Sequence, residues 1–277
     1  AISDLPSLAW QPSGLTYFVA WEDDRPGAFQ IYLVRLNAVG AKIGADTAIS
    51  ASATSARDPS LVLGDAEREL GVAWTDTRNG ANGEIYLARI DAATATRIGA
   101  ELRVTTDAGV SDSAAIGWSG TEYGLVWRDL RDGNAEIYFA RVSALGVKIG
   151  ADVRLTNDTS VSQMPAIVWT GAEWAIVWSD LRTTSGDIYF TRVSAVGVEV
   201  GADVQLTSTG GGTGLEDQPS IAWNGCTIGV AWRHAAGANN VRALIASATG
   251  TILGGPYAVS ATADVEREPS IAAGPLR

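Results

Sequence analysis

A unit of about 53 residues repeats along this sequence. Its clearest marker is a tryptophan that ends an apolar run and is followed by a polar turn. These tryptophans are Trp21, Trp74, Trp127, Trp178 and Trp232, so successive copies are 53, 53, 51 and 54 residues apart. Repeat periods of roughly 20 to 50 residues are typical of solenoids, propellers and other arrays. The repeat therefore restricts the fold to architectures that multiply one supersecondary unit.

Each unit contains four short apolar runs that are bounded by Gly, Pro, Asp or Ser. In the fourth unit these runs are residues 165–169, 174–178, 188–193 and 204–207. Their length and their β-branched and aromatic residues indicate strands, and no window carries a helical apolar period of useful length. Four strands with short connections make an antiparallel meander, and several meanders packed radially make a β-propeller. We therefore predict an all-β fold, a propeller of four-stranded antiparallel blades.

The number of blades follows from counting the runs. The first run occurs six times and the other three occur five times, which predicts five blades with a surplus first strand; six blades with one incomplete is the alternative. We expect one domain over residues 1–277. Its predicted repeat units cover residues 6–58, 59–113, 114–164, 165–218 and 219–268, with the extra first strand at 269–273.

Charge and composition exclude several kinds of partner. The formal charge of -11 repels phosphate backbones, so we expect no nucleic-acid partner. No apolar stretch is long enough to cross a bilayer, so we expect no membrane insertion. A single cysteine, Cys226, excludes an intrachain disulfide. We predict no cofactor, although the acidic loops leave calcium as a possible ligand, and the oligomeric state stays open.

An Asp and an Arg two residues further on follow the marker tryptophan in four units. These pairs are Asp23 and Arg25, Asp76 and Arg78, Asp129 and Arg131, and Asp180 and Arg182. The Asp side chain can accept amide hydrogens of the turn, and the Arg can pair with a carboxylate or lie on an aromatic ring. Repetition in four units favours a structural clamp. The functional alternative is a ring of equivalent ligand-binding sites, one per blade.

The fifth unit departs from this pattern. His234 stands where the Asp is expected, and Arg242 replaces the tyrosine of the third run. Together with Arg233, these residues form a candidate binding site for an anionic group. The alternative is that a closing blade has lost its constraints and drifted.

Acidic residues also precede the first runs, in segments expected to lie on the same face as the Asp/Arg turns. They are Asp4, Asp58, Asp112, Asp217 and Glu268. This face is therefore the predicted binding surface. No spaced Asp-x-Asp-x-Asp loop for calcium is present, so a metal site is not assigned.

The fourth unit resembles a known family. The order L-T-N, P-A-I-V-W, V-W-S-D-L-R and D-I-Y-F, from Leu155 to Phe190, looks like the WD-like propeller repeat of TolB-type proteins. The resemblance covers nearly the whole chain and implies a propeller of the kind found in bacterial secreted or surface proteins. The chain lacks TolB's partner-binding N-terminal domain, and its repeat is longer. TolB's envelope role and protein partner therefore do not carry over.

These observations predict a non-catalytic, lectin-like propeller of the bacterial cell surface or of secreted proteins. It would recognise carbohydrate or protein on the face with the W-x-D-x-R turns, where several weak sites gain avidity. We expect no catalytic residues, because most acids follow the repeat, and one histidine without a nucleophile motif argues against a triad. The alternatives are a protein–protein scaffold without a small ligand and a glycoside hydrolase-like enzyme, which needs two carboxylates of different roles.

Overall fold

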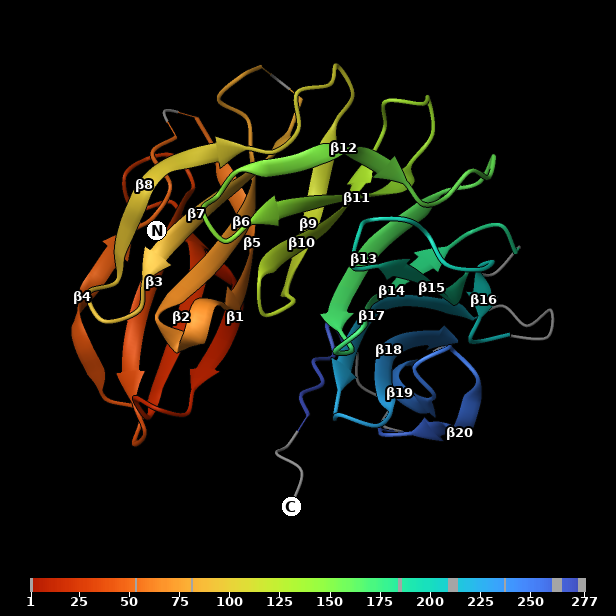
Figure 1. Ribbon diagram of the computed structural model, residues 1–277. Coiled ribbons are helices and arrows are strands. Elements are labelled where there is room, and N and C mark those ends of the chain that lie inside the picture. The colour runs from red at the N-terminus through yellow and green to blue at the C-terminus, as the bar shows by residue number, and fades with distance from the viewer. Residues whose placement is uncertain are drawn as a thin grey trace. The chain divides into compact units, whose positions relative to one another are not determined.

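The chain forms five four-stranded antiparallel sheets arranged as a β-propeller (Figure 1). This computed structural model describes residues 2–52, 54–80, 82–183, 186–208, 214–236, 238–260 and 266–273. The predicted fold class and the count of five blades are confirmed. The chain divides into two compact units, residues 1–131 with 140–151 and residues 132–139 with 152–277, which are described in turn.

The first unit contains blades 1 and 2 and the first half of blade 3. Each blade is a meander in which neighbouring strands in the sequence pair. The strands are β1 (Ser3–Gln11), β2 (Thr16–Asp23), β3 (Gln30–Asn37) and β4 (Lys42–Ala48) in blade 1; β5 (Ala56–Leu63), β6 (Glu69–Asp76), β7 (Glu84–Asp91) and β8 (Thr96–Arg103) in blade 2; and β9 (Ser111–Trp118) and β10 (Glu122–Asp129) in blade 3. A short 3₁₀ turn, η1 (Asp65–Glu67), joins β5 to β6.

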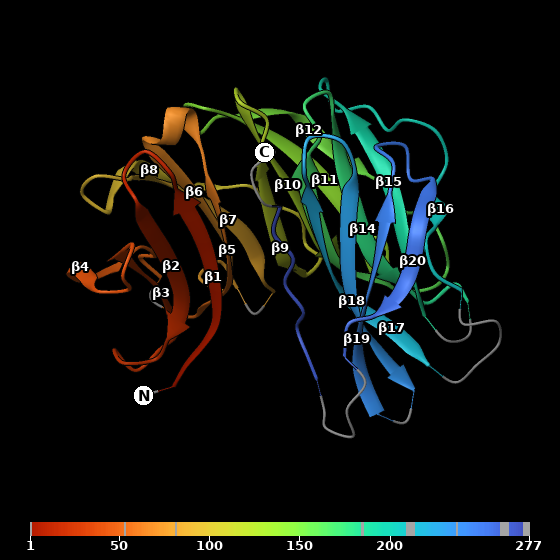
Figure 2. The ribbon, with the colours of Figure 1, turned by 90° about the horizontal axis from the view of Figure 1, so that it is seen from below.

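The second unit contains blades 4 and 5. Their strands are β13 (Ser162–Trp169), β14 (Glu173–Asp180), β15 (Asp187–Ser194) and β16 (Val204–Gln205) in blade 4, and β17 (Leu215–Trp223), β18 (Ile228–Ala236), β19 (Ala238–Ala246) and β20 (Ile252–Ala258) in blade 5. The four strands of blade 5 lie side by side in both views (Figure 1 and Figure 2). The remaining strands of blade 3, β11 (Glu136–Ser143) and β12 (Lys148–Arg154), contribute residues to both units.

The core of each unit lies between successive blades. In the first unit Phe18 and Leu33 of blade 1 belong to one buried cluster with Leu70 and Trp74 of blade 2. In the second unit Phe190 of blade 4 shares a cluster with blade 5. The second strands β6 and β14 are buried on both faces, which is why they read as continuous apolar runs rather than as alternating ones, whereas β2 alternates between buried and partly exposed residues. Sheet-on-sheet burial of these side chains stabilises the blades at about 25 cal/mol per Å² of apolar surface.

A β-bulge interrupts the first strand of each blade. The register with the second strand shifts there, for example between Arg57 and Ser60. One residue in each bulge has a left-handed backbone, and it always comes directly before the proline or alanine that opens the apolar run. These residues are Leu5, Asp58, Ser113, Met164 and Gln218, with φ between 49° and 55°. First strands therefore begin three or four residues before the predicted runs. Four of the acids that precede those runs lie inside strands, namely Asp4, Asp58, Asp112 and Asp217, whereas Glu268 lies outside the strands.

Residues 266–273 lie against blade 5 in the way that a first strand lies against the preceding blade. The backbone N–H of Ile271 donates to Ser220 Oγ at 3.2 Å. The same bond joins Ile116 to Ser60 at 3.2 Å in the first unit. Residues 269–273 thus make a hydrogen bond of the kind that a first strand makes, although they belong to none of the five sheets, and the surplus first strand stays a prediction. Within the described residues, no helix is long and apolar enough to cross a membrane.

Candidate functional site

The repeated Trp, Asp and Arg residues form a clamp at the end of the second strand in blades 1 to 4. In blade 4 the carboxylate of Asp180 accepts hydrogen bonds from Trp178 Nε1 at 2.8 Å and from Ser162 Oγ at 2.9 Å. Arg182 donates to the same carboxylate from its backbone N–H at 2.9 Å and from Nη2 at 2.7 Å. Asp180 is fully buried. Burial opposes its ionisation, but the bonds from Arg182 and Trp178 outweigh it and lower its pKa.

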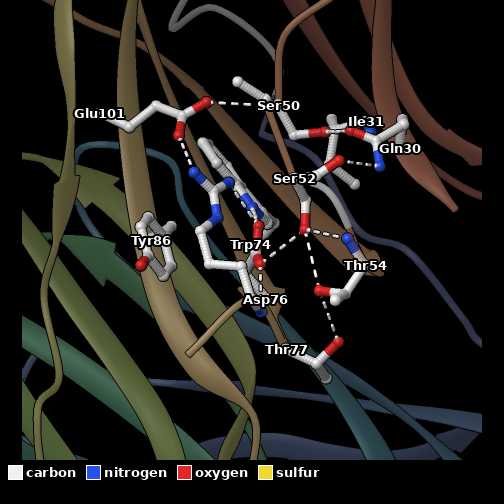
Figure 3. A network of polar contacts seen from close by, with 12 residues as sticks. Gln30, Ile31, Ser50, Ser52, Thr54, Trp74, Asp76, Thr77, Tyr86 and Glu101 are labelled. Carbon is white, nitrogen blue, oxygen red and sulfur yellow. Dashed lines mark hydrogen bonds and ion pairs between the residues drawn. The ribbon is translucent and has the colours of Figure 1, made fainter. Parts of the chain in front are cut away.

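Blade 2 shows which further residues contact the Asp and the Arg of a clamp. Figure 3 shows Asp76 between Trp74 and Ser52, and Ser52 Oγ donates to Asp76 at 2.9 Å. The guanidinium of Arg78, which pairs with Asp76, also forms an ion pair with Glu101 of β8. Arg25 reaches Asp46 in the same way in blade 1. The eight Asp and Arg residues singled out by the repeat therefore satisfy one another within their blades. Ligand binding by them stays a prediction.

Blade 5 replaces the clamp with a different buried pair. His234 Nδ1 lies 2.7 Å from Glu216 Oε1, and Arg242 Nη1 lies 3.9 Å from the same oxygen. Burial raises the pKa of Glu216 to about 7, and burial with the nearby Arg242 lowers the pKa of His234. Arg233 forms an ion pair with Asp217. The structure thus brings His234 and Arg242 together, but around a carboxyl group that competes with any anionic ligand.

A separate group of carboxyls lies in the first unit, at the bulge of blade 2. Asp58 is half-buried there, and its carboxyl forms no hydrogen bond or ion pair with any described residue. Burial, together with the negative charges of Glu22 and Asp112, raises the pKa of Asp58 to about 6, against the opposing pull of Arg57 and Arg128. A carboxyl with these properties still holds its proton in mildly acidic solution.

Asp112 of β9 supplies a second carboxyl of different character. It pairs with Arg128 of β10, whose Nε donates to Asp112 Oδ1 at 2.7 Å and whose Nη2 donates to Oδ2. A half-buried acid beside an ion-paired carboxylate is an arrangement that separates acid and base roles between two otherwise similar groups. Sequence reasoning identified Asp58 and Asp112 only as members of an acidic set, and it missed Glu22.

Metal binding finds no support in the geometry. Among the described residues, no three or more His, Cys, Asp or Glu side chains are grouped so as to hold a metal ion. The open question of calcium therefore receives no candidate site from this part of the chain.

Comparison with known proteins was made on sequence and on structure. No family model matches the sequence, and no curated protein matches it. Solved structures do match. An α-L-arabinofuranosidase from Lactobacillus brevis has a TM-score of 0.56 at 15% identity, over 93% of this chain and 95% of that chain. An endo-arabinase from Bacteroides thetaiotaomicron VPI-5482 has a TM-score of 0.53 at 14% identity, over 88% and 93%. A thermostable family-43 glycoside hydrolase has a TM-score of 0.56 at 11% identity, over 96% and 98%.

These likenesses correct the predicted function. At such identities they show the β-propeller fold, and the propellers concerned are named as enzymes that act on glycans. The expectation of a non-catalytic binding propeller is overturned, and the glycoside hydrolase-like alternative is favoured. The expectation failed because the acids were judged by their recurrence in sequence. Their environments differ between blades, and environment decides what a carboxyl can do.

Proposed function

We propose that the chain is a glycoside hydrolase in which Asp58 is the general acid and Asp112 is the second carboxylate. The observation that carries this proposal is the Asp58 carboxyl, which is half-buried, forms no hydrogen bond or ion pair within the described part of the chain and has a pKa raised to about 6. Glycoside hydrolysis requires one carboxylic acid that donates a proton to the leaving oxygen and one carboxylate at the opposite side of the sugar. The fold shared with an endo-arabinase and an α-L-arabinofuranosidase supports α-L-arabinofuranosides as the substrate class.

The proton balance of this reaction assigns each group a task. Asp58 gives its proton to the glycosidic oxygen as the bond between that oxygen and the anomeric carbon breaks. Asp112 either takes a proton from the attacking water or bonds to the anomeric carbon until water releases the sugar. Which route is followed depends on the separation of the two carboxyls from each other. NMR of the first-formed anomer distinguishes inversion from retention.

The test is hydrolysis of 4-nitrophenyl α-L-arabinofuranoside and of linear arabinan by the purified protein. We expect Asp58→Asn and Asp112→Asn each to lower kcat/KM by about 100-fold or more. Asp217→Asn is the matched control. Asp217 pairs with Arg233 as Asp112 pairs with Arg128, but the bulge of the blade before Asp217 carries Met164 where the blade before Asp112 carries Asp58. A wild-type protein without activity on arabinofuranosides or on other pentosides contradicts the proposal.

Asp4 gives a second way to test the assignment. It holds the position in β1 that Asp112 holds in β9. Within the described structure its Oδ1 accepts the N–H of Leu5, at 2.9 Å, and the carboxylate has no cationic partner. If Asp4→Asn abolishes activity and Asp112→Asn does not, the second carboxylate is Asp4, and Asp112 is a structural partner of Arg128.

The TolB-type repeat and the secreted or surface location, both predicted from the sequence, are part of the same proposal. Kinship of the repeat with TolB-type propellers rests on the motif from Leu155 to Phe190, and secretion or surface display accords with a polymeric glycan as substrate. Fractionation of the producing cells tests the location: recovery of the protein in the cytosol alone contradicts it.

A further inference from the structure

Glu22 is a buried carboxylate that the repeat does not explain. It follows the marker tryptophan of blade 1, where the other blades carry Thr75, Arg128, Ser179 and Arg233. Only 2% of its surface is exposed. A carboxylate at such a depth is costly unless it is paired and hydrogen-bonded. Its partners should therefore reveal why it is there.

Those partners lie in the bulge that carries Asp58. Glu22 Oε2 accepts the backbone N–H of Asp58 at 3.0 Å, and Oε1 faces Arg57 Nη1 at 3.4 Å. The bond thus crosses from β2 of blade 1 to β5 of blade 2. In the second unit Ser179 holds the corresponding position and also reaches the next blade, but its Oγ donates to the backbone carbonyl of Glu216 at 2.8 Å and accepts no N–H from the bulge residue Gln218 in the described structure. A charged acceptor on the amide of the bulge residue therefore distinguishes blade 1 from blade 4.

The bond acts on a strained backbone. Asp58 has φ of 54°, a left-handed conformation that is unfavourable for a residue with a side chain. A charged acceptor on its amide offsets part of this cost, since hydrogen bonds to charged groups are stronger than those between neutral groups. The Asp58 side chain therefore leaves the backbone in a direction that Glu22 helps to determine.

The same carboxylate also acts on the Asp58 side chain. The charged groups that face Asp58 are Glu22 from β2, Arg57 from its own strand, Asp112 from β9 and Arg128 from β10. Arg128 is occupied by Asp112, and the Arg57 side chain is about half exposed. Burial and the two acids therefore disfavour the charged form of Asp58 more than the two cations favour it. Of the two acids, Glu22 has the larger effect.

We infer that Glu22 is a positioning residue, which holds the Asp58 backbone in the bulge and keeps the Asp58 carboxyl in its proton-bearing form for acid catalysis. This inference rests on the proposed function of Asp58. Glu22 itself touches neither substrate nor reacting atoms, because it acts through the amide and the field of Asp58.

The experiment is a carboxyl ¹³C NMR titration of Asp58 in the wild type and in Glu22→Gln. The amide oxygen of Gln can still accept the Asp58 N–H, whereas the charge is gone. We expect the proton affinity of Asp58 to fall by about tenfold, a change of one pKa unit. Asp24→Asn, which removes a charge two residues along the same strand end, is the control and should leave the Asp58 titration in place. An unchanged Asp58 titration in Glu22→Gln overturns the inference.

A second variant covers a failure of Glu22→Gln to fold. Glu22→Ser introduces the residue that blade 4 tolerates at this position, and it should lower the Asp58 proton affinity by at least as much. The titration needs no catalysis, so it stands even if the wild type hydrolyses nothing, which would contradict only the proposed function. In an active enzyme, the decline of kcat/KM at high pH should move to lower pH in Glu22→Gln, with kcat affected more than KM. A decline that stays in place while activity drops shows a structural role only.

Discussion

Glu216 and His234 face each other across β17 and β18, with Oε1 and Nδ1 2.7 Å apart. In blades 1, 3 and 4 the same pair of positions holds a serine on the first strand and the clamp aspartate on the second. Blade 5 has therefore moved its carboxyl group from the second strand to the first. The exchange leaves Trp232 Nε1 and Glu216 Oε2 buried without a hydrogen-bond partner in the described structure.

This exchange predicts a pH-dependent stability. Burial raises the pKa of Glu216 to about 7 from an ordinary value near 4.5, so its stabilising contribution is fully present below pH 4.5 and is lost as pH rises through 7. Glu216→Gln removes this loss. We expect the variant and the wild type to be similar in unfolding free energy at pH 5 and the variant to be more stable by about 2 kcal/mol at pH 8. Urea unfolding at both pH values measures the difference.

The lowered pKa of His234 acts in the opposite direction, because its contribution is lost as pH falls below its ordinary range near 6.5. Wild type and variant share this histidine, so it largely cancels in the comparison. Glu173→Gln is a suitable control, since Glu173 pairs with Arg192 at the surface and should change stability equally at both pH values. If Glu216→Gln is less stable than the wild type at pH 8, the pair is an ion pair, and the neutral description of Glu216 is wrong.

The clamp in blade 4 predicts a large difference between two carboxylates that share one arginine. Asp180→Ala leaves the Trp178 N–H and the Ser162 hydroxyl without their acceptor and Arg182 without its buried partner. Removal of one member of a buried pair costs about 3–5 kcal/mol. Asp203→Ala removes only the outer partner of Arg182. The pKa of Asp203 is raised by its own burial, so its loss should cost less than about 1 kcal/mol. Equal losses in thermal unfolding contradict a structural clamp.

The proposed acid should reduce the stability of the fold that carries it. The pKa of Asp58 is raised to about 6 from 3.8, so its contribution to stability is present below pH 3.8 and is lost as pH rises through 6. Asp58→Asn should therefore raise the unfolding free energy by about 1–2 kcal/mol at pH 7.5 and leave it unchanged near pH 4. Asp112→Asn, which breaks the pair with Arg128, should lower it at pH 7.5. A loss of stability in Asp58→Asn at pH 7.5 shows that the carboxylate has a partner in solution.

The repeat predicts the sheets well because each strand is short, apolar and bounded by turn residues, and the same pattern occurs five times. It also predicts the pairing of Asp and Arg in the clamp, since side chains two residues apart on one turn are close enough to bond. For the strands and for this pair, the residues that make the prediction lie within about ten positions of one another in the sequence.

The site depends on contacts of a longer range. In the sequence, the bulge at Asp58 is marked only by the proline that follows it. The residues before a proline at Leu5, Met164 and Gln218 have the same left-handed backbone, so this signal does not single out Asp58. The charge of Glu22 reaches Asp58 from a strand of the preceding blade, 36 residues earlier. Such a contact follows from the packing of one blade on the next. A weak signal was present, since Glu22 is the one acid at its position in the five units.

The position of residues 266–273 against blade 5 predicts a specific steric coupling. A Cβ on Gly229 would lie 2.8 Å from Ile271 Cδ1, the far end of that side chain, so Gly229→Ala should displace the Ile271 side chain and cost up to about 1 kcal/mol in unfolding free energy. Ile271→Ala creates the missing space, so the loss in the double variant should be smaller than the sum of the two single losses by most of the Gly229→Ala cost. Gly71→Ala is the control, because its Cβ would meet the buried ring of Tyr123 at 2.6 Å in the other unit, and it should add to Ile271→Ala without coupling. Additive behaviour of the Gly229 and Ile271 substitutions would show that residues 266–273 do not occupy the first-strand position in solution.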